Sequence, residues 1–473
     1  MSHFDVIVLG CGPAGERAAI HAARAGRQVA VIERYHVVGG TAVNWGTIPS
    51  KTLRESAMFV HSLTQRKLEG FHYELADQIS IGDFMFRERI VVQRELELIN
   101  QSLDRYRIQV FQGAARFVDA HTVGLVGVDG QLRTQLTGDV IVIATGTSPS
   151  RPDDVPFDDA CVFDSDGILQ LPAMPRSMVV LGAGVVGVEY ASIFAALGLQ
   201  VTLVDTRDRL LPYLDREVAA VLERELRRMG VVMVHDERHA LIEVTDGHGA
   251  PRVQITTRSG NRLEADVLLY SVGRDGNTLD LGLEQVGIRP TDRGLIEINA
   301  HHQTVVPHIY AVGDVVGYPA LANTAMDQGR RAIRHALKLE TPSGRTEVLG
   351  FAIYSIPELS YVGETEEALV ERGVDYVVGR GDYNQNARGQ ILGESGGMLK
   401  LLFARPSGTL LGAHMVGRGA SELIHIGQAY ISMGSTAEQI AETLFNYPTL
   451  SDMYRHAALV ALKELRAVGA GIP

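Results

Sequence analysis

The chain has 473 residues, 45% of them hydrophobic and 21% charged, and its formal net charge at pH 7 is −12. This length predicts two to four domains, because one hydrophobic core does not extend over so many residues. The acidic balance argues against nucleic acid and against an anionic membrane surface as partners, since both need a basic protein face.

The two cysteines, Cys11 and Cys161, are too few for a disulfide framework or a cysteine metal cluster, and no histidine pattern predicts a metal site. The chain has no run of about 18 uncharged apolar residues and no N-terminal signal pattern. We therefore expect a cytoplasmic protein without a transmembrane helix.

Residues 4–33 predict a βαβ unit. Residues 6–9 form a continuous apolar run, which is typical of a strand buried on both faces. The next residues match G-x-G-x-x-G and open an alanine-rich helix, and the second strand ends at Glu33. Such a turn lets backbone N–H groups approach a pyrophosphate, and the terminal acid can accept hydrogen bonds from ribose hydroxyls. The predicted dinucleotide contacts here are Gly10, Gly12, Pro13, Ala14, Gly15, Glu33 and Arg34.

Residues 177–205 repeat this pattern. The same number of residues separates the first glycine from the terminal acid in both units, so we expect two dinucleotides on one polypeptide. Asp205 suits the 2′-hydroxyl of NAD(H), whereas Arg207 and Arg209 suit the 2′-phosphate of NADP(H); the alternative is that both arginines are ordinary surface charges. The predicted contacts of this unit are Gly182, Gly184, Val185, Val186, Gly187, Asp205, Arg207 and Arg209.

The chain continues with further strands and an interdomain connection. A buried strand ends in Ala144-Thr145-Gly146, and residues 147–176, rich in proline, predict the connection. Another strand leads to Gly273 and Arg274, and an apolar segment ends at Gly313-Asp314 ahead of a helix beginning near Leu321. From about residue 350 the pattern predicts an antiparallel sheet with flanking helices.

Residues 38–51 carry a family resemblance. They read VGGTAVNWGTIPSK, which resembles the segment Gly-Thr-Cys-x-x-x-Gly-Cys-Ile-Pro-Ser-Lys of the flavin-dependent pyridine nucleotide-disulfide oxidoreductases. Ala42 and Thr47 stand at the positions of the two redox cysteines. The scaffold around a dithiol is present, and both thiols are missing.

Almost the whole chain resembles the glutathione reductase and dihydrolipoyl dehydrogenase group of that family. The resemblance implies an α/β protein with two Rossmann-like dinucleotide-binding domains and a C-terminal α+β dimerisation domain. It implies FAD on residues 1–150 and 276–348, NAD(H) or NADP(H) on residues 151–275, and dimerisation through residues 349–473. The expected assembly is a homodimer or a higher homo-oligomer.

The resemblance also implies roles for individual residues. Asp314 would hold the flavin ribityl chain, and the helix near Leu321 would point at the flavin pyrimidine. Lys51, paired with Glu189, would lie near the reactive edge of the isoalloxazine. The further cofactor contacts expected are Gly40, Thr41, Gly46, Ala115, Ala144, Thr145, Gly146, Gly273, Arg274, Gly313, Ala322 and Thr324.

The C-terminal motif departs from the disulfide reductases. Their His-Pro-Thr-x-x-Glu, a base and its orienting carboxylate, is replaced by Tyr447-Pro448-Thr449-Leu450-Ser451-Asp452. A base that manages thiol protons has no task once the thiols are absent, so the two losses go together chemically. Tyr447 stands at the position of the histidine and is a candidate catalytic residue, whose role the sequence leaves open.

The segments 44–51, 206–211 and 445–449 resemble the soluble flavin-containing pyridine nucleotide transhydrogenases. This resemblance implies ping-pong hydride transfer between NADPH and NAD⁺ through FAD. Two alternatives stay open: an NAD(P)H oxidase or quinone/dye reductase of the same fold, and a nucleotide-sensing flavoprotein without turnover. The physiological direction is open as well.

Overall fold

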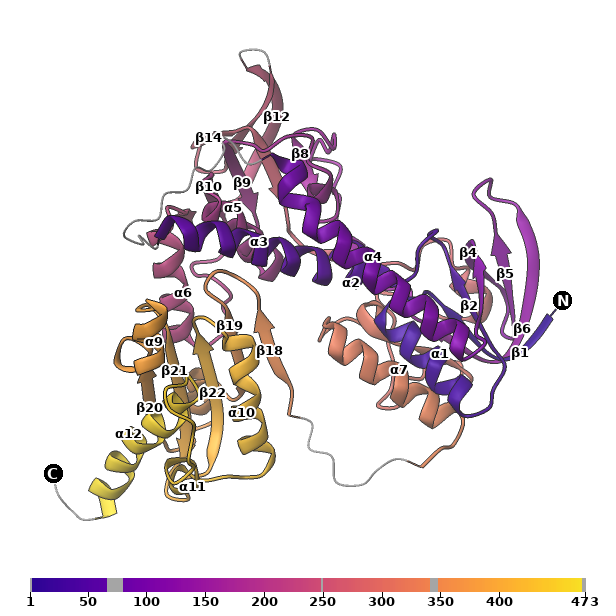
Figure 1. Cartoon of the computed structure of the whole chain (residues 1–473). Coiled ribbons are helices and arrows are strands. Elements are labelled where there is room, and N and C mark those ends of the chain that lie inside the picture. The colour runs from indigo at the N-terminus through magenta and orange to yellow at the C-terminus, as the bar shows by residue number, and fades with distance from the viewer. Residues whose placement is uncertain (1, 66–79, 248–249, 341–347, 470–473) are drawn as a thin grey trace. The chain divides into compact units, whose positions relative to one another are not determined.

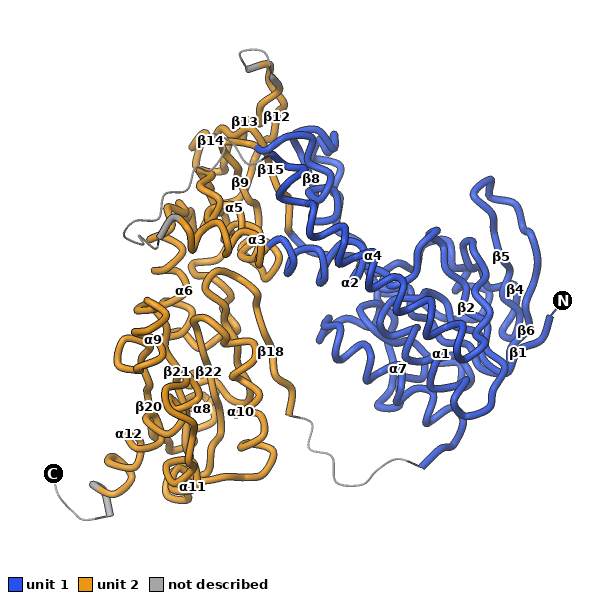
Figure 2. The backbone as a smooth tube through the Cα atoms, viewed as in Figure 1, with its two compact units in different colours: residues 1–53, 75–174, 272–343 blue, residues 54–74, 175–271, 344–473 orange. Residues whose placement is uncertain are grey.

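The computed structural model describes residues 2–65, 80–247, 250–340 and 348–469. Its contacts divide the chain into two compact units (Figure 2). Unit 1 comprises residues 1–53, 75–174 and 272–343, and unit 2 comprises residues 54–74, 175–271 and 344–473. The domain boundaries expected from the sequence stay a prediction.

Unit 1 is built on a seven-stranded sheet (Figure 1). Its parallel part has the order β3-β2-β1-β6, and β17 also pairs with β6. The sheet continues from β6 through the antiparallel strands β5 and β4. The strands are β1 (Ser2–Leu9), β2 (Val29–Glu33), β3 (Gln109–Gln112), β4 (Ala114–Asp119), β5 (Thr122–Val126), β6 (Leu132–Ile143) and β17 (Ile309–Ala311).

The helices of unit 1 include α1 (Pro13–Arg24), α2 (Gly40–Asn44), α4 (Ile81–Arg105) and α7 (Ala322–Ala336); α3 (Thr47–Gln65) begins here. Short elements follow the main sheet, and the expected connection over residues 147–176 contains some of them. They are β7 (Thr147–Pro149), β8 (Val162–Asp164), β16 (Arg274–Gly276) and the 3₁₀ turns η1 (Gly167–Gln170), η2 (Leu283–Val286) and η3 (Gly313–Val316).

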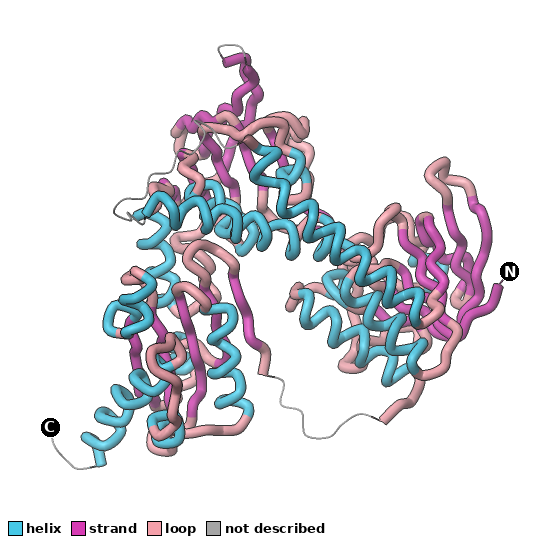
Figure 3. Tube along the Cα trace, in the orientation of Figure 1, coloured by secondary structure: helices cyan, strands magenta, loops and turns pink. Residues whose placement is uncertain are grey.

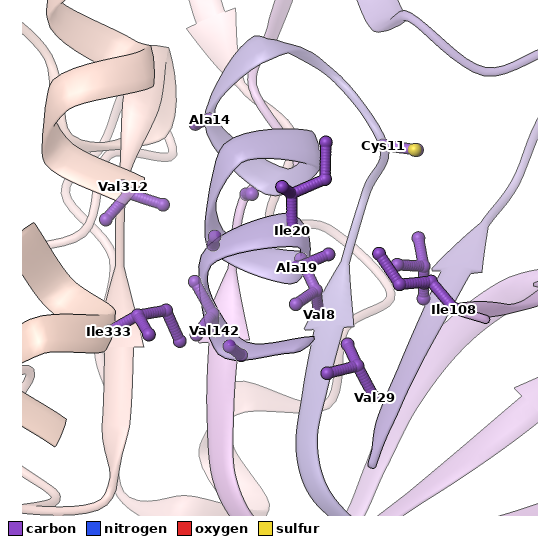
Figure 4. Close-up of a cluster of buried hydrophobic side chains, with 14 of the residues drawn as sticks. Val8, Cys11, Ala14, Ala19, Ile20, Val29, Ile108, Val142, Val312 and Ile333 are labelled. Carbon is purple, nitrogen blue, oxygen red and sulfur yellow. The ribbon is translucent and has the colours of Figure 1, made fainter. Parts of the chain in front are cut away.

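Strand β1 is buried on both faces, as its apolar run predicts. Val6 and Val8 pack into one hydrophobic cluster with α1 and α7, whereas Ile7 and Leu9 pack into another on the opposite face. Figure 4 shows the first cluster, with Val8, Ala19 and Ile333 among its members. A sheet covered on both faces leaves its carboxyl end as the place for a ligand.

Unit 2 opens with a second parallel sheet, in which β11, β10, β9 and β15 lie side by side. An antiparallel sheet of β12, β13 and β14 follows. The elements are β9 (Ser177–Leu181), α5 (Val185–Ala196), β10 (Gln200–Val204), α6 (Arg216–Arg228), β11 (Val232–Val234), β12 (His239–Gly247), β13 (Ala250–Thr257), β14 (Arg262–Ala265) and β15 (Val267–Tyr270).

The C-terminal part of unit 2 is the expected antiparallel sheet, ordered β18-β19-β22-β21-β20. Figure 3 shows helices alongside this sheet. The hydrophobic core of this part includes Phe403 and Tyr454. Its elements are β18 (Gly350–Ile353), β19 (Leu359–Gly363), α8 (Glu366–Glu371), β20 (Tyr376–Asp382), η4 (Tyr383–Gln385), α9 (Ala387–Leu392), β21 (Met398–Ala404), β22 (Leu410–Val416), α10 (Ala420–Ser432), α11 (Ala437–Ala441) and α12 (Asp452–Gly469).

Candidate active site

A cavity of about 410 Å³ lies at the carboxyl ends of the parallel strands of unit 1. Its volume falls in the range of small-molecule sites, and its place is where open α/β sheets bind ligands. Many residues predicted from the sequence line it: Gly10, Gly12, Pro13, Ala14, Glu33, Arg34, Gly40, Thr41, Ala115, Ala144, Thr145, Gly146, Gly313, Asp314 and Ala322.

The glycine turn after β1 is shaped for close backbone approach. A Cβ on Gly15 would lie 1.9 Å from the Gly10 carbonyl oxygen, so the first turn of α1 can lie against the turn only without a side chain. Gly12 caps α1 without any side-chain hydrogen bond. The first N–H groups of the helix are therefore open to an anion such as a pyrophosphate.

Glu33 ends β2 beneath this turn. Its buried carboxylate accepts hydrogen bonds from the backbone N–H groups of Cys11 at 2.7 Å and Tyr35 at 3.1 Å. Burial raises the pKa of Glu33. A carboxylate has about four acceptor positions, so these two bonds orient it and leave capacity for hydroxyl groups.

The other end of the cavity holds polar atoms with unused bonding capacity. Thr147 Oγ1 donates to Asp314 Oδ2 over a long 3.4 Å, and burial raises the pKa of Asp314. Thr145 Oγ1 is buried with no hydrogen-bond partner among the described residues. Buried polar groups normally have hydrogen-bond partners. Asp314 Oδ2 and Thr145 Oγ1 therefore fit a ligand rich in hydroxyl groups.

Helix α7 begins beside Asp314 with Leu321 as its N-cap and no side-chain cap. Its open N–H groups can stabilise negative charge on a bound ring. Leu321 and Thr324 are absent from the lining of the cavity, and Thr324 Oγ1 donates to the carbonyl of Leu321 at 2.8 Å. Together with the glycine turn and Glu33, this end fits an extended dinucleotide such as FAD.

Sequence reasoning missed several polar residues at this cavity. Asn277 Nδ2 donates to the Thr145 carbonyl at 2.9 Å, and Ser148 Oγ donates to Asn277 Oδ1 at 2.8 Å. The predicted Arg274 donates from Nε to Thr147 Oγ1 and from Nη2 to the Thr147 carbonyl, both at 2.9 Å. Antiparallel pairing of β7 with β16 brings these segments together. No local signal announces a pairing of segments more than a hundred residues apart.

The segment that replaces the redox cysteines lies at the same cavity. Ala42, Trp45 and Thr47 line it, and the Trp45 ring lies 4.7 Å from the Tyr35 ring. Gly46, which does not line the cavity, and Lys51 complete the segment, and Lys51 Nζ donates to Ser50 Oγ at 3.2 Å. The side chains at the two cysteine positions are a methyl group and a hydroxyl, which cannot form a disulfide.

The two cysteines of the chain do not compensate. Both are buried, and Cys161 Sγ donates to Asp158 Oδ2 at 3.1 Å. Burial raises the pKa of Cys11, and burial together with Asp158 raises that of Cys161 to about 12. Both thiols are therefore protonated at neutral pH and unreactive as nucleophiles.

Unit 2 repeats the glycine turn. Gly184 has φ −76° and ψ −175°, the same values as Gly12, and a Cβ on Gly187 would lie 1.9 Å from the Gly182 carbonyl oxygen. Helix α5 likewise has no side-chain cap, and Val185 and Val186 form its first turn. Asp205 accepts from the Ala183 N–H at 2.5 Å, as Glu33 accepts from Cys11. The predicted internal repeat is confirmed down to its hydrogen bonds.

The remaining predicted residues lie in both units. Glu189 is 4% exposed, and its Oε1 accepts from the Tyr354 N–H at 2.9 Å. Lys51 and Gly273 belong to unit 1 and Glu189 to unit 2, so the pairing of Lys51 with Glu189 stays a prediction. Tyr447 is 78% exposed, and its catalytic role stays a prediction too.

The described residues contain neither a helix that could span a membrane nor a cluster of metal-ligating side chains. None of their helices is long and apolar enough to cross a membrane. None of their His, Cys, Asp and Glu side chains gather in threes or more as a metal ion would need.

Solved structures share this architecture. LpdA from Mycobacterium tuberculosis superposes with a TM-score of 0.88 at 29% identity, covering 97% of this chain and 99% of that one. The HOCl-induced flavoprotein disulfide reductase RclA from Escherichia coli superposes with a TM-score of 0.85 at 27% identity, covering 96% and 99%.

Sequence comparison extends over nearly the whole chain. A protein named soluble pyridine nucleotide transhydrogenase from Mycobacterium tuberculosis (strain ATCC 25177 / H37Ra) is 45% identical over 468 residues, 99% of each chain. A protein of that name from Enterobacter sp. (strain 638) is 44% identical, covering 98% of this chain and 100% of its own. The family model for pyridine nucleotide-disulphide oxidoreductases matches residues 4–329, and the model for their dimerisation domain matches residues 351–458. The predicted fold class is confirmed. The chain belongs to the pyridine nucleotide-disulphide oxidoreductase family.

Proposed function

We propose that this protein transfers hydride between NADPH and NAD⁺ by a ping-pong mechanism without a redox-active disulfide. The carrying observation is that Ala42 and Thr47 stand at the cavity where the disulfide reductases have their two cysteines. Electrons that reach the cavity therefore have no covalent acceptor in this segment. The name shared by relatives at 44–45% identity supports the same reaction.

FAD held in this cavity would supply the hydride-transfer chemistry. The glycine turn and α1 would hold its pyrophosphate, Glu33 its adenosine ribose, and Asp314 its ribityl hydroxyls. The open end of α7 would stabilise negative charge on the reduced ring. Lys51 and Glu189 would adjust the reactive edge of the flavin, and Tyr447 would occupy the position that the base has in the disulfide reductases.

The second turn would bind the nicotinamide dinucleotides. NADPH and NAD⁺ would occupy it in succession, which requires one site that accepts both the 2′-phosphate and the 2′-hydroxyl. Asp205, Arg207 and Arg209 are the residues proposed for that discrimination. The physiological direction would follow the ratios of the two couples.

We also propose a homodimer in the cytoplasm. The match to the dimerisation domain over residues 351–458 supports the assembly, and the word soluble in the relatives' names supports the location. Sedimentation of the purified protein should give a mass of twice 51.4 kDa or a higher multiple. A monomer at micromolar concentration would contradict the assembly.

Steady-state turnover tests the reaction. With NADPH as donor, we expect thio-NAD⁺ to be reduced far faster than oxygen, quinones or lipoamide disulfide. A rate with oxygen or quinones that exceeds the rate with thio-NAD⁺ would instead identify an oxidase or quinone reductase. Flavin that stays oxidised after anaerobic addition of NADPH would identify a sensor.

A further inference from the structure

The two dinucleotide turns of this chain differ at their terminal acids. Asp205 Oδ1 accepts from Arg207 N at 2.9 Å and from Arg207 Nε at 2.6 Å. Asp205 Oδ2 accepts from Ala183 N at 2.5 Å and from Arg207 Nη2 at 2.6 Å. These bonds fill the four acceptor positions that a carboxylate offers.

Glu33 provides the comparison within the same molecule. Its carboxylate accepts hydrogen bonds from the backbone N–H groups of Cys11 and Tyr35, and Arg34 acts on it by charge and through its own backbone N–H. The neighbouring cation, Arg34, donates to the Tyr35 hydroxyl at 2.7 Å and lies over its ring. The acid of the first turn can therefore receive hydroxyl groups directly, whereas that of the second turn is saturated by its own arginine.

The pair at the second turn is strong and half-exposed. The Asp205 side chain is 4% exposed and that of Arg207 is 38% exposed, so the guanidinium can turn outward while the carboxylate stays in place. The parallel two-bond contact has the charge-assisted geometry of the strongest arginine–carboxylate pairs. Burial opposes ionisation of Asp205, but the Arg207 and Ala183 hydrogen bonds outweigh it and lower the pKa.

Each proposed nucleotide must disturb this contact. The 2′-hydroxyl of NAD(H) needs an acceptor position on Asp205, and Arg207 must release one. The 2′-phosphate of NADP(H) is repelled by a bare carboxylate, and Arg207 must turn from Asp205 to neutralise it. Arg209 offers a second cation, because its buried Nη1 has no hydrogen-bond partner among the described residues.

We propose that the Asp205–Arg207 ion pair is a latch that either nucleotide must open, so that one site accepts both NAD(H) and NADP(H). The proposal rests on the proposed function for the identity of the two ligands. Since either nucleotide must open the same contact, the cost of opening falls on both and does not discriminate between them. Removing one partner should therefore shift the two affinities in opposite directions.

Calorimetric binding of NAD⁺ and NADP⁺ to the oxidised holoenzyme tests the latch. Arg207→Ala should lower the affinity for NADP⁺ by about tenfold or more, because a charged hydrogen bond is lost. It should raise the affinity for NAD⁺ by a few-fold, because Asp205 becomes accessible. Asp205→Asn should do the reverse, tightening NADP⁺ and weakening NAD⁺. Arg207→Lys, which keeps the charge and loses the two-bond contact, should tighten NAD⁺ and keep most of the NADP⁺ affinity.

Arg224→Ala on α6 is the matched control, since that arginine is exposed, and both affinities should stay at their wild-type values. The latch is overturned if Arg207→Ala weakens NAD⁺ and NADP⁺ alike, or if Asp205→Asn fails to tighten NADP⁺. Binding is measured without turnover, so failure of the latch can be told apart from failure of the proposed reaction. A wild-type protein that binds both nucleotides yet transfers no hydride would refute the reaction and leave the latch standing.

Discussion

Buried carboxylates at the ends of strands are the residues on which cofactor binding depends. Asp314 contacts Thr147 only over 3.4 Å and lies near Arg274, whose charge partly offsets the effect of burial on the carboxyl pKa. Leaving a carboxylate partly desolvated costs free energy unless a ligand completes its hydrogen bonds. The free energy that a dinucleotide recovers there should appear as affinity.

We predict that Asp314→Asn weakens FAD binding to the apoprotein by about ten- to a hundredfold, because a charged acceptor becomes a neutral one. The wild-type dissociation constant should also rise as the pH falls through the Asp314 pKa, which burial holds above its usual range. Below that pKa the carboxyl is protonated and accepts fewer hydrogen bonds. Fluorescence titration with FAD from pH 4 to pH 8 measures both effects.

The variant should lose most of that pH dependence, since its amide does not titrate. Asp129→Asn is the control, because that carboxylate lies on an exposed turn and pairs with Arg133. An Asp314→Asn protein with wild-type affinity at neutral pH would remove Asp314 from the cofactor site.

At the scale of elements, the two strand–turn–helix units are matched in geometry and are proposed to hold different ligands. A methyl group on Gly15 or Gly187 would meet a carbonyl oxygen at 1.9 Å in either case. The two oxygens belong to Gly10 and Gly182, which directly follow β1 and β9, so neither can move without disturbing the end of its strand. The same substitution can therefore separate the two sites.

We predict that Gly15→Ala and Gly187→Ala each lower the free energy of unfolding by about 1–3 kcal/mol through overpacking. Gly15→Ala should lose FAD, whereas Gly187→Ala should keep FAD and lose NADPH binding. Flavin absorbance after gel filtration and thermal denaturation measure the two effects. Gly82→Ala on α4 is the control, since Gly82 also lies in the first turn of a helix, is not at positive φ, and its added Cβ would meet Ser80 Oγ at an ordinary 3.7 Å. Loss of both ligands from both variants would contradict separate sites.

A buried lysine connects elements within unit 2. Lys400 of β21 is 1% exposed on its side chain, and its Nζ lies 2.9 Å from Asp215 Oδ2 and 3.0 Å from Glu217 Oε2, with Glu366 as a further partner. Asp215 is the N-cap of α6, so the lysine ties that helix to the C-terminal sheet. Removing the cation would leave the buried Asp215 carboxylate without its counterion, whereas the part-exposed Glu217 would keep its ion pair with Arg380.

We predict that Lys400→Met lowers the free energy of unfolding by about 3–5 kcal/mol, the cost of breaking a buried ion pair on one side. Urea denaturation at pH 7 measures the change. Lys463→Met on α12, where the lysine is exposed, should stay within about 0.5 kcal/mol of wild type. Equal stability of the two variants would show that the Lys400 cluster contributes nothing net.

How much the sequence predicts follows the range of the interactions. The glycine turns and their acids are local patterns, and the structure reproduces both. The run around Lys400 predicts a strand, but its counterions come from residues that lie far away in the chain. Asn277 reaches the cavity because β16, which directly precedes it, pairs with the distant strand β7. The saturation of Asp205 depends on one side-chain conformation, which no sequence pattern encodes.

At the scale of the whole molecule, the chain matches its family over nearly its full length but lacks the redox dithiol. Residues 4–329 and 351–458 match the two family models, and both cysteine positions carry other side chains. The C-terminal histidine of the disulfide reductases is Tyr447 here, and this side chain is exposed. A protein with two dinucleotide turns and no thiol relay is suited to exchange hydride between diffusible nucleotides.

Anaerobic stopped-flow absorbance of the flavin tests this account most directly. Mixing with one equivalent of NADPH should bleach the oxidised flavin band in a single phase, and a second mixing with NAD⁺ should restore it fully at a rate matching turnover. Reoxidation by lipoamide or glutathione disulfide as fast as by NAD⁺ would contradict the account. So would a second, thiol-linked pair of electrons taken up from excess NADPH.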